Sequence, residues 1–113
     1  HVGDDVRVWY NLKLPHIDGL AKLETVDGYL TIHENPALQH LDGLSNVKTV
    51  GEDVVIDYNF VLSDITVIST IDTVAGYLKL VHHKDLCQSH AQSVAAMISV
   101  QGETEVSEND DCP

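Results

Sequence analysis

The stretch Tyr29-Leu30-Thr31-Ile32-His33-Glu34-Asn35-Pro36-Ala37-Leu38-Gln39-His40-Leu41-Asp42-Gly43-Leu44 has a counterpart 24 positions earlier in the chain, at residues 5–20. The same register continues through two further copies. The matched positions are Val6/Leu30/Val54/Leu78, Val8/Ile32/Ile56/Leu80, Asn11/Asn35/Asn59/His83 and Leu14/Leu38/Leu62/Leu86. A fixed period of this length predicts an architecture of repeated units, because each unit adds the same side chains to one continuous core.

The pattern L-x-I-x-x-N-x-x-L-x-x-L is typical of a leucine-rich repeat. Each copy should hold one short strand, and stacking the copies about 4.8 Å apart would pair the strands in a parallel sheet. The sequence therefore predicts a mostly β fold, a leucine-rich-repeat or right-handed β-helix-like solenoid of about five 24-residue rungs. The expected rungs lie near residues 5–28, 29–52, 53–76, 77–100 and 101–113, within a single domain of residues 1–113.

Two columns of apolar residues should face the interior of each rung, and the most buried are expected to be Leu30, Ile32, Val54 and Ile56. The Asn column lies where the chain leaves the strand, so its side-chain amides can bond to backbone groups of the turn. His83 replaces an Asn in this column. A second apolar stretch recurs at residues 19–26, 43–50 and 67–74, with apolar residues at i, i+3 and i+6. This spacing predicts short strands or turns.

The repeat is interrupted after Leu86 by an apolar stripe that is typical of an amphipathic helix. The stripe consists of Ala91, Val94, Ala95 and Ile98. The sequence predicts a capping helix at about residues 89–99, with Ser89 as its N-cap and Gly102 as its stop. A last strand should follow it, with Thr104 and Val106 facing inward and Asn109 on the Asn column. The helix would cover the open end of the core.

The only two cysteines, Cys87 and Cys112, flank this cap and suggest a disulfide. The alternative is two free thiols in a cytosolic protein, and a zinc site has no further ligands at suitable spacing. A disulfide would indicate an oxidising, extracytoplasmic compartment. At the other end Val2 aligns with Val26, so the chain starts inside a repeat. Upstream rungs and a secretion signal are therefore expected, or a partner that meets this end.

Eighteen acidic and six basic residues give a net charge of −12. This charge argues against nucleic acid and anionic lipid as partners. No apolar run is long enough to insert into a membrane. No nucleophile elbow, phosphate loop or HExxH motif occurs, so no catalytic residue and no cofactor is expected.

Residues that alternate with the inward columns should form the outward face of the sheet. Large aromatic side chains on this face are candidate contacts for a ligand, because the core does not require them there. The candidate ligand-binding residues are Trp9, Tyr10, His33, Asp57, Tyr58 and His82. Trp9 could instead only shield the edge of the sheet. His16 and His40 occupy equivalent positions, continued by Asp64 and Gln88, and are weak candidates for a metal site because a repeat aligns like residues automatically.

The run at residues 43–51, followed by Val54-Val55-Ile56-Asp57-Tyr58-Asn59, resembles the receptor L-domain family. The ending Leu86-Cys87 and Asn109-Asp110-Asp111-Cys112-Pro113 is similar to the cysteine-bearing cap of L-domain-like repeat proteins of bacterial and fungal cell surfaces. His83 in the Asn column and Val67 in place of glycine depart from the pattern. The resemblance implies a secreted or surface-attached recognition module and no chemistry.

We therefore expect a non-enzymatic extracellular or cell-surface recognition or adhesion module that is part of a longer repeat protein. Its ligand would be a protein or a carbohydrate. The alternative is a structural subunit that binds copies of itself end to end through its open N-terminal rung. A metal-dependent enzyme is the least favoured option.

Overall fold

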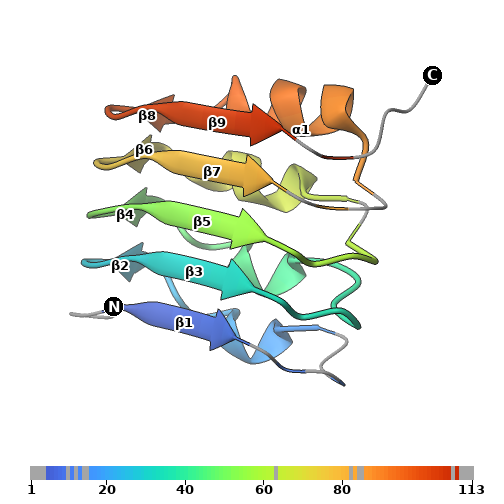
Figure 1. The fold of residues 1–113 in the computed structure, drawn as a ribbon. Helices are drawn as coiled ribbons and strands as arrows, with labels where there is room; N and C mark the ends of the chain where they lie inside the picture. The colour runs from blue at the N-terminus through green and yellow to red at the C-terminus, as the bar shows by residue number, and fades with distance from the viewer. Residues whose placement is uncertain are drawn as a thin grey trace.

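The regular elements in the described part of the chain are two parallel sheets, three 3-10 helices and one α-helix (Figure 1). The computed structural model describes residues 5–9, 11, 13, 16–62, 64–81, 83, 86–107 and 109. The larger sheet contains β1 (Val6–Trp9), β3 (Leu30–His33), β5 (Val54–Asp57), β7 (Leu78–Val81) and β9 (Thr104–Ser107), in that order. The smaller sheet contains β2 (Thr25–Val26), β4 (Thr49–Val50), β6 (Thr73–Val74) and β8 (Ser99–Val100).

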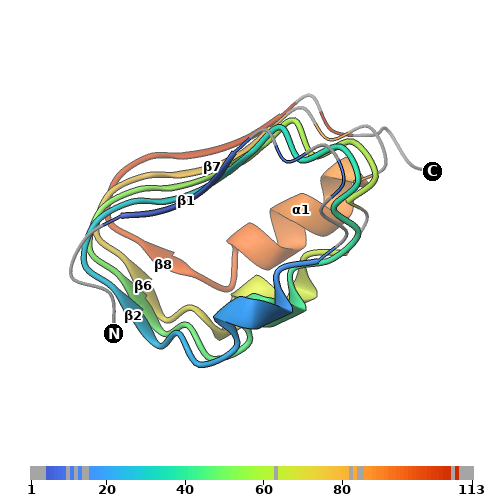
Figure 2. The ribbon, with the colours of Figure 1, turned by 90° about the horizontal axis from the view of Figure 1, so that it is seen from below.

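Each strand pairs with the strand that occupies the same place in the next copy of the repeat. Leu30 pairs with Val54 in parallel register, and Val54 in turn pairs with Leu78. The last step is longer by two residues, because Leu78 pairs with Thr104. Both the parallel pairing and the 24-residue register are therefore confirmed, and Figure 2 shows the copies lying over one another.

The core lies between the two sheets and is lined by the predicted inward columns. Leu30, Ile32, Val54 and Ile56 are 0% exposed, as expected for strands that have neighbours on both sides. The ends of the larger sheet are less well covered. In β1, Val6 and Val8 are only partly buried, and Thr104 in β9 is exposed although it was predicted to face inward. A side chain in the inward column is thus buried only where another copy covers it.

The second apolar stretch differs from the prediction of short strands or turns alone. It begins with a 3-10 helix in each of the first three copies: η1 (Asp18–Leu20), η2 (Asp42–Leu44) and η3 (Thr66–Thr70). It then continues into the short strands β2, β4 and β6. A 3-10 helix has three residues per turn, so residues at i and i+3 lie on the same side. The i, i+3 spacing of the apolar residues fits this helix, so the preference for an extended segment over a helical turn was wrong for the first part of each stretch.

The capping helix α1 spans Gln88–Ala95 and is shorter than the predicted range of about 89–99. Its N-cap is Cys87 and not Ser89. Gly102 is not its stop, because residues 99–100 form β8 and pair with β6. The strand pairing ends the helix early, yet Ala91, Val94, Ala95 and Ile98 are all buried as predicted. In Figure 2, α1 extends inward from the outline of the 3-10 helices, over the interior at the C-terminal end.

The Asn column forms a hydrogen-bonded ladder just after the strands of the larger sheet. The side-chain amide of Asn59 donates to the main-chain oxygen atoms of Ile32 and Asp57, each at 3.0 Å. Its Oδ1 accepts from the main-chain N–H of Asn35 at 3.1 Å. His83 continues the column, buried, with its Nδ1 2.8 Å from Oδ1 of Asn109. The prediction that side chains of the Asn column bond to backbone groups of the turn is confirmed, and His83 has a hydrogen-bond partner in the same column.

Candidate functional site

The outward face of the larger sheet carries the first candidate residues at the ends of β1, β3 and β5. Trp9 pairs with His33, and His33 pairs with Asp57, so these side chains form one column across three strands. Trp9 is 45% exposed, which is unusual for so large a ring. The column continues to Val81, which is only 4% exposed although it lies outside the central core. The other two candidates, Tyr10 and His82, lie outside the described residues.

The backbone turns sharply at the residue after β3 and after β5. Glu34 and Tyr58 occupy equivalent positions and have φ values of 54° and 57°, in the left-handed region that residues other than glycine rarely adopt. Each of these two residues lies between an outward residue, His33 or Asp57, and a buried Asn of the ladder. The left-handed conformation costs roughly 1–2 kcal/mol per residue. Strained backbone of this kind often occurs at ligand sites, because the surrounding fold must hold it in place.

Four rings lie next to one another where β1, β3 and β5 end. We call them the aromatic cluster: Trp9, His33, Tyr58 and Phe60. Each consecutive pair has edge-to-face geometry, with ring centroids 6.1 Å apart for Trp9 and His33, 5.6 Å for His33 and Tyr58, and 6.3 Å for Tyr58 and Phe60. Such pairs contribute roughly 0.5–1.5 kcal/mol beyond their buried area. The cluster is therefore a preformed aromatic surface that combines three copies of the repeat.

Phe60 was not among the predicted site residues, although it is 45% exposed and completes the cluster. It lies in the turn after the Asn ladder, at the position equivalent to Pro36. The only signal in the sequence is that the single Phe of the chain lies outside both inward columns. Its contact with Tyr58 depends on the left-handed backbone of Tyr58, which the repeat pattern does not indicate.

Two carboxylates lie close to the His33 ring of the aromatic cluster. The Nδ1 atom of His33 lies 2.5 Å from a carboxylate oxygen of Asp57, and its Nε2 atom lies 3.6 Å from a carboxylate oxygen of Glu34. The side chains of His33 and Asp57 are largely buried, whereas that of Glu34 is 43% exposed. The Asp57 carboxylate on the neighbouring strand thus holds the His33 ring, whereas the Glu34 side chain is partly accessible to solvent.

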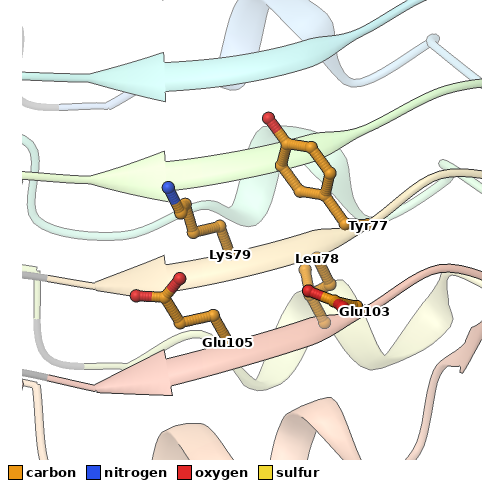
Figure 3. Close-up of a pocket in the computed structure, with 5 residues that line it drawn as sticks. All are labelled: Tyr77, Leu78, Lys79, Glu103 and Glu105. Carbon is orange, nitrogen blue, oxygen red and sulfur yellow. The ribbon is translucent and has the colours of Figure 1, made fainter.

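Two shallow hollows lie on or beside the outward face. One, of about 250 Å³, is lined by Glu34, Pro36, Tyr58 and Phe60. The other, of about 230 Å³, is lined by Tyr77, Leu78, Lys79, Glu103 and Glu105. Figure 3 shows the Lys79 and Glu105 side chains next to each other on neighbouring strands, with Tyr77 extending toward the adjacent strand. This second hollow contains the Lys79 ammonium, whereas the described residues around the first include one carboxylate and no cation.

An acidic edge runs beside the starts of the large-sheet strands. The carboxylates of Asp5 and Asp53 accept hydrogen bonds from the main-chain N–H groups of Tyr29 and Tyr77, at 2.9 and 3.0 Å. The nearby carboxylate of Glu52, followed by that of Asp53, raises the pKa of the Tyr29 hydroxyl above its ordinary value, because a phenolate there would be repelled. This edge therefore has a negative potential, in keeping with the net charge of −12.

The histidine column is arranged differently from the prediction. The rings of His16 and His40 stack with centroids 6.0 Å apart, and His40 forms a β-bridge with Asp64. The next member is His90 and not Gln88, since Nε2 of His90 lies 3.3 Å from the Asp64 carboxylate. The two extra residues of the fourth copy cause this shift. Within the described residues, no group of three or more His, Cys, Asp or Glu side chains could hold a metal ion.

Cys87 is disulfide-bonded and lies partly buried at the start of α1. Its predicted partner, Cys112, lies outside the described residues. The bond ties the capping helix to another part of the chain. The structure therefore contains a covalent link at the end of the core that α1 covers.

Comparison of the chain with protein-family models, curated proteins and solved structures finds no match in any of the three. In the described ranges, no helix is both long and apolar enough to cross a membrane. What the protein does is therefore inferred from its own residues.

Proposed function

We propose that the protein is a non-enzymatic recognition or adhesion module that binds a protein or carbohydrate ligand through the aromatic cluster. The carrying observation is the contact between Trp9, His33, Tyr58 and Phe60 across three copies of the repeat, with two of the rings 45% exposed. Rigid exposed aromatic rings are favoured contacts at binding surfaces, because they lose little conformational freedom when a ligand covers them.

We further propose that the chain is a leucine-rich-repeat solenoid of the receptor L-domain-like type. The strand order β1-β3-β5-β7-β9, the constant register of 24 residues and the Asn ladder support this proposal. Folds of this kind present one face of a stacked sheet as an extended binding surface. A similar fold alone would not determine the function, so the proposed binding role rests on the aromatic cluster.

An extracellular or cell-surface location is supported by the disulfide at Cys87, because such bonds persist in oxidising compartments. Mass spectrometry of the unreduced, protease-digested protein should give one crosslinked peptide that contains Cys87 and Cys112. Two free thiols in the secreted protein would remove this support.

The binding proposal is tested with immobilised glycans and a panel of purified extracellular-matrix proteins. We expect at least one ligand that binds the wild-type protein and is lost in the double variant Trp9→Ala/Tyr58→Ala. The matched control is Met97→Ala, which removes an exposed apolar side chain just after α1. Equal binding by both variants, or no ligand in either panel, would contradict a recognition role for the aromatic cluster.

A second candidate is self-association of the larger sheet through the edge strand β1. Val6 and Val8 continue the inward columns but are only partly buried, so a second copy could extend both columns. The net charge of −12 opposes such stacking. Sedimentation velocity at increasing protein concentration separates the two candidates. A monomer at all concentrations would exclude self-association and leave the recognition proposal unaffected.

A further inference from the structure

The hollow beside the aromatic cluster is formed by two pairs of equivalent residues from adjacent copies of the repeat. Glu34 and Tyr58 are one pair, and Pro36 and Phe60 are the other. The copy at residues 29–52 contributes a carboxylate and a proline ring, and the copy at residues 53–76 contributes two aromatic rings. A repeat with identical copies would not produce this combination. The hollow thus has a specific chemistry that the fold alone does not supply.

The left-handed backbone of Glu34 and Tyr58 creates the hollow. A regular strand would alternate inward and outward side chains, so the residue after outward His33 would point into the core. With φ values of 54° and 57°, Glu34 and Tyr58 instead stay at the surface, and the ladder residues Asn35 and Asn59 become buried. The main-chain N–H groups of Glu34 and Tyr58 still bond to the next strand, at 3.1 and 3.3 Å. Both side chains are therefore held on a rigid base.

Two aromatic rings, those of Tyr58 and Phe60, line the hollow. The planes of these two rings are inclined at 72° to each other, so their faces point in different directions. A cation within about 6 Å of a ring centroid is attracted by the negative face of the ring. The molecule already contains one such contact, because the guanidinium carbon of Arg7 lies 5.4 Å from the centroid of the Trp9 ring.

The polar side of the hollow is anionic. The Glu34 carboxylate is the charged group among the described residues that line the hollow, and its side chain is 43% exposed. His33 Nε2 lies 3.6 Å from one of its oxygens, a longer distance than that between His33 Nδ1 and Asp57. In the hollow at Tyr77 and Glu105, by contrast, Lys79 supplies a cation from the chain itself. The exposed part of the Glu34 side chain is therefore accessible to a cation from a partner.

The size of the hollow limits what it can hold. Pockets for complete small-molecule ligands are usually about 300–1,000 Å³, and this one is about 250 Å³. It suits the end of one side chain better than a whole ligand. A net charge of −12 would also attract a basic partner and repel an acidic one.

We propose that the hollow between Glu34, Pro36, Tyr58 and Phe60 binds the ammonium group of a lysine side chain presented by a partner protein. The inference rests on the proposed recognition function and names the chemistry of its ligand. Glu34 supplies the counter-charge, Tyr58 and Phe60 supply the cation–π surface, and Pro36 closes the apolar side.

The test uses the folded, disulfide-bonded protein labelled with ¹⁵N and followed by two-dimensional NMR at about 150 mM NaCl, where long-range charge effects are largely screened. The probes are N-acetyl-lysine N-methylamide and its Nε-acetylated counterpart, which has the same backbone but no positive charge. We expect the charged probe to shift the resonances of Glu34, Tyr58 and Phe60, and the neutral probe to leave them unchanged.

Variants of the hollow separate its charge from its rings. Phe60→Leu keeps an apolar side chain but removes the ring, and should weaken binding of the charged probe about two- to fivefold. Glu34→Gln should weaken it by a similar factor, whereas the control Glu24→Gln, which removes the same charge outside the hollow, should have no effect. Circular dichroism would establish that each variant is folded.

Three results would overturn the inference. The first is equal binding of the charged and neutral probes, and the second is no shift at any concentration of the charged probe. The third is a set of shifts spread over many carboxylates, with equal losses for Glu34→Gln and Glu24→Gln. None of these affects the proposed recognition function, because that function depends on loss of a ligand in Trp9→Ala/Tyr58→Ala and not on charge.

Discussion

The central and terminal strands of the larger sheet contain the same kinds of residue at the same positions, yet they differ in burial. Val54 in β5 is completely buried, whereas Val6, two copies earlier in the same column, is only partly buried. Asn59 and Asn11 show the same contrast, since Asn59 is buried and Asn11 is exposed. In a stacked repeat, each copy is stabilised mainly by its neighbours. Position in the stack therefore decides how much a given residue contributes to stability.

The largest effect is expected at the centre of the core. Ile56→Ala should lower the free energy of unfolding by roughly 2–5 kcal/mol, because it removes buried methylene groups and leaves a cavity between two covered strands. The outward substitution Thr31→Ala should cost well under 1 kcal/mol. Urea denaturation measures both. Similar losses at the two sites would mean that the inward and outward assignment is wrong.

A matched pair of valines tests the comparison directly. Val54→Ala should cost about 2 kcal/mol, from two buried carbon groups at about 0.8 kcal/mol each and a small cavity term. Val6→Ala removes the same groups from a partly covered site and should cost about 1 kcal/mol or less. Equal losses in the urea experiment would contradict the idea that neighbouring copies determine burial.

The Asn ladder should show the same gradient. Asn59→Ala leaves the main-chain oxygen of Ile32 and the main-chain N–H of Asn35 without their side-chain partner, and both lie in a buried region. A cost of about 1–3 kcal/mol is expected, because a buried unsatisfied polar group loses its solvation. Asn11→Ala, at the exposed end of the ladder, should lower the free energy of unfolding by much less than Asn59→Ala. Hydrogen exchange at the Asn35 amide would reveal whether the ladder opens locally.

Gly51, directly after β4, tests how closely two copies of the repeat approach each other. A Cβ atom at Gly51 would lie 2.2 Å from the main-chain oxygen of Asp27 in the preceding copy, so an alanine does not fit. Gly51→Ala should cost about 1–3 kcal/mol through overpacking. Gly19→Ala is the control, since nothing lies within 4 Å of its Cβ position, and should change stability by about 0.5 kcal/mol or less. Thermal unfolding of the two variants compares them.

The smallest effect is expected from pH at Asp64, whose side chain is 70% exposed. Hydrogen bonds from the hydroxyl and main-chain N–H of Thr66 lower the pKa of the Asp64 carboxyl below its ordinary value of 3.8. A lowered pKa stabilises the folded state above pH 3.8, and this contribution is lost as the pH falls through the lowered value. Asp64→Asn should therefore be slightly less stable than wild type at pH 5, and the difference should shrink at pH 3. A difference that does not depend on pH would contradict this assignment.

The sequence predicted the parallel pairing, the register of 24 residues, the buried columns and the structural role of the Asn ladder. These features follow from side-chain period and repeat spacing, which are properties of the linear chain. It also placed Trp9, His33 and Asp57 in one outward column, because residues in register on parallel strands are neighbours in space. The same reasoning could be applied to any copy of the repeat.

Other features depended on the tertiary structure. The left-handed backbone at Glu34 and Tyr58 and the contact of Phe60 with Tyr58 were not predictable, because a two-residue period assumes a regular strand. The end of α1 at Ala95 was set by the pairing of β8 with β6, and this pairing outweighed the apolar stripe that continued to Ile98. His90 replaced Gln88 beside Asp64 because the fourth copy is longer by two residues. Local sequence thus determined which side chains face the core, whereas the stacking of one copy on the next determined where helices end and which surface side chains meet, since those contacts join residues that are distant along the chain.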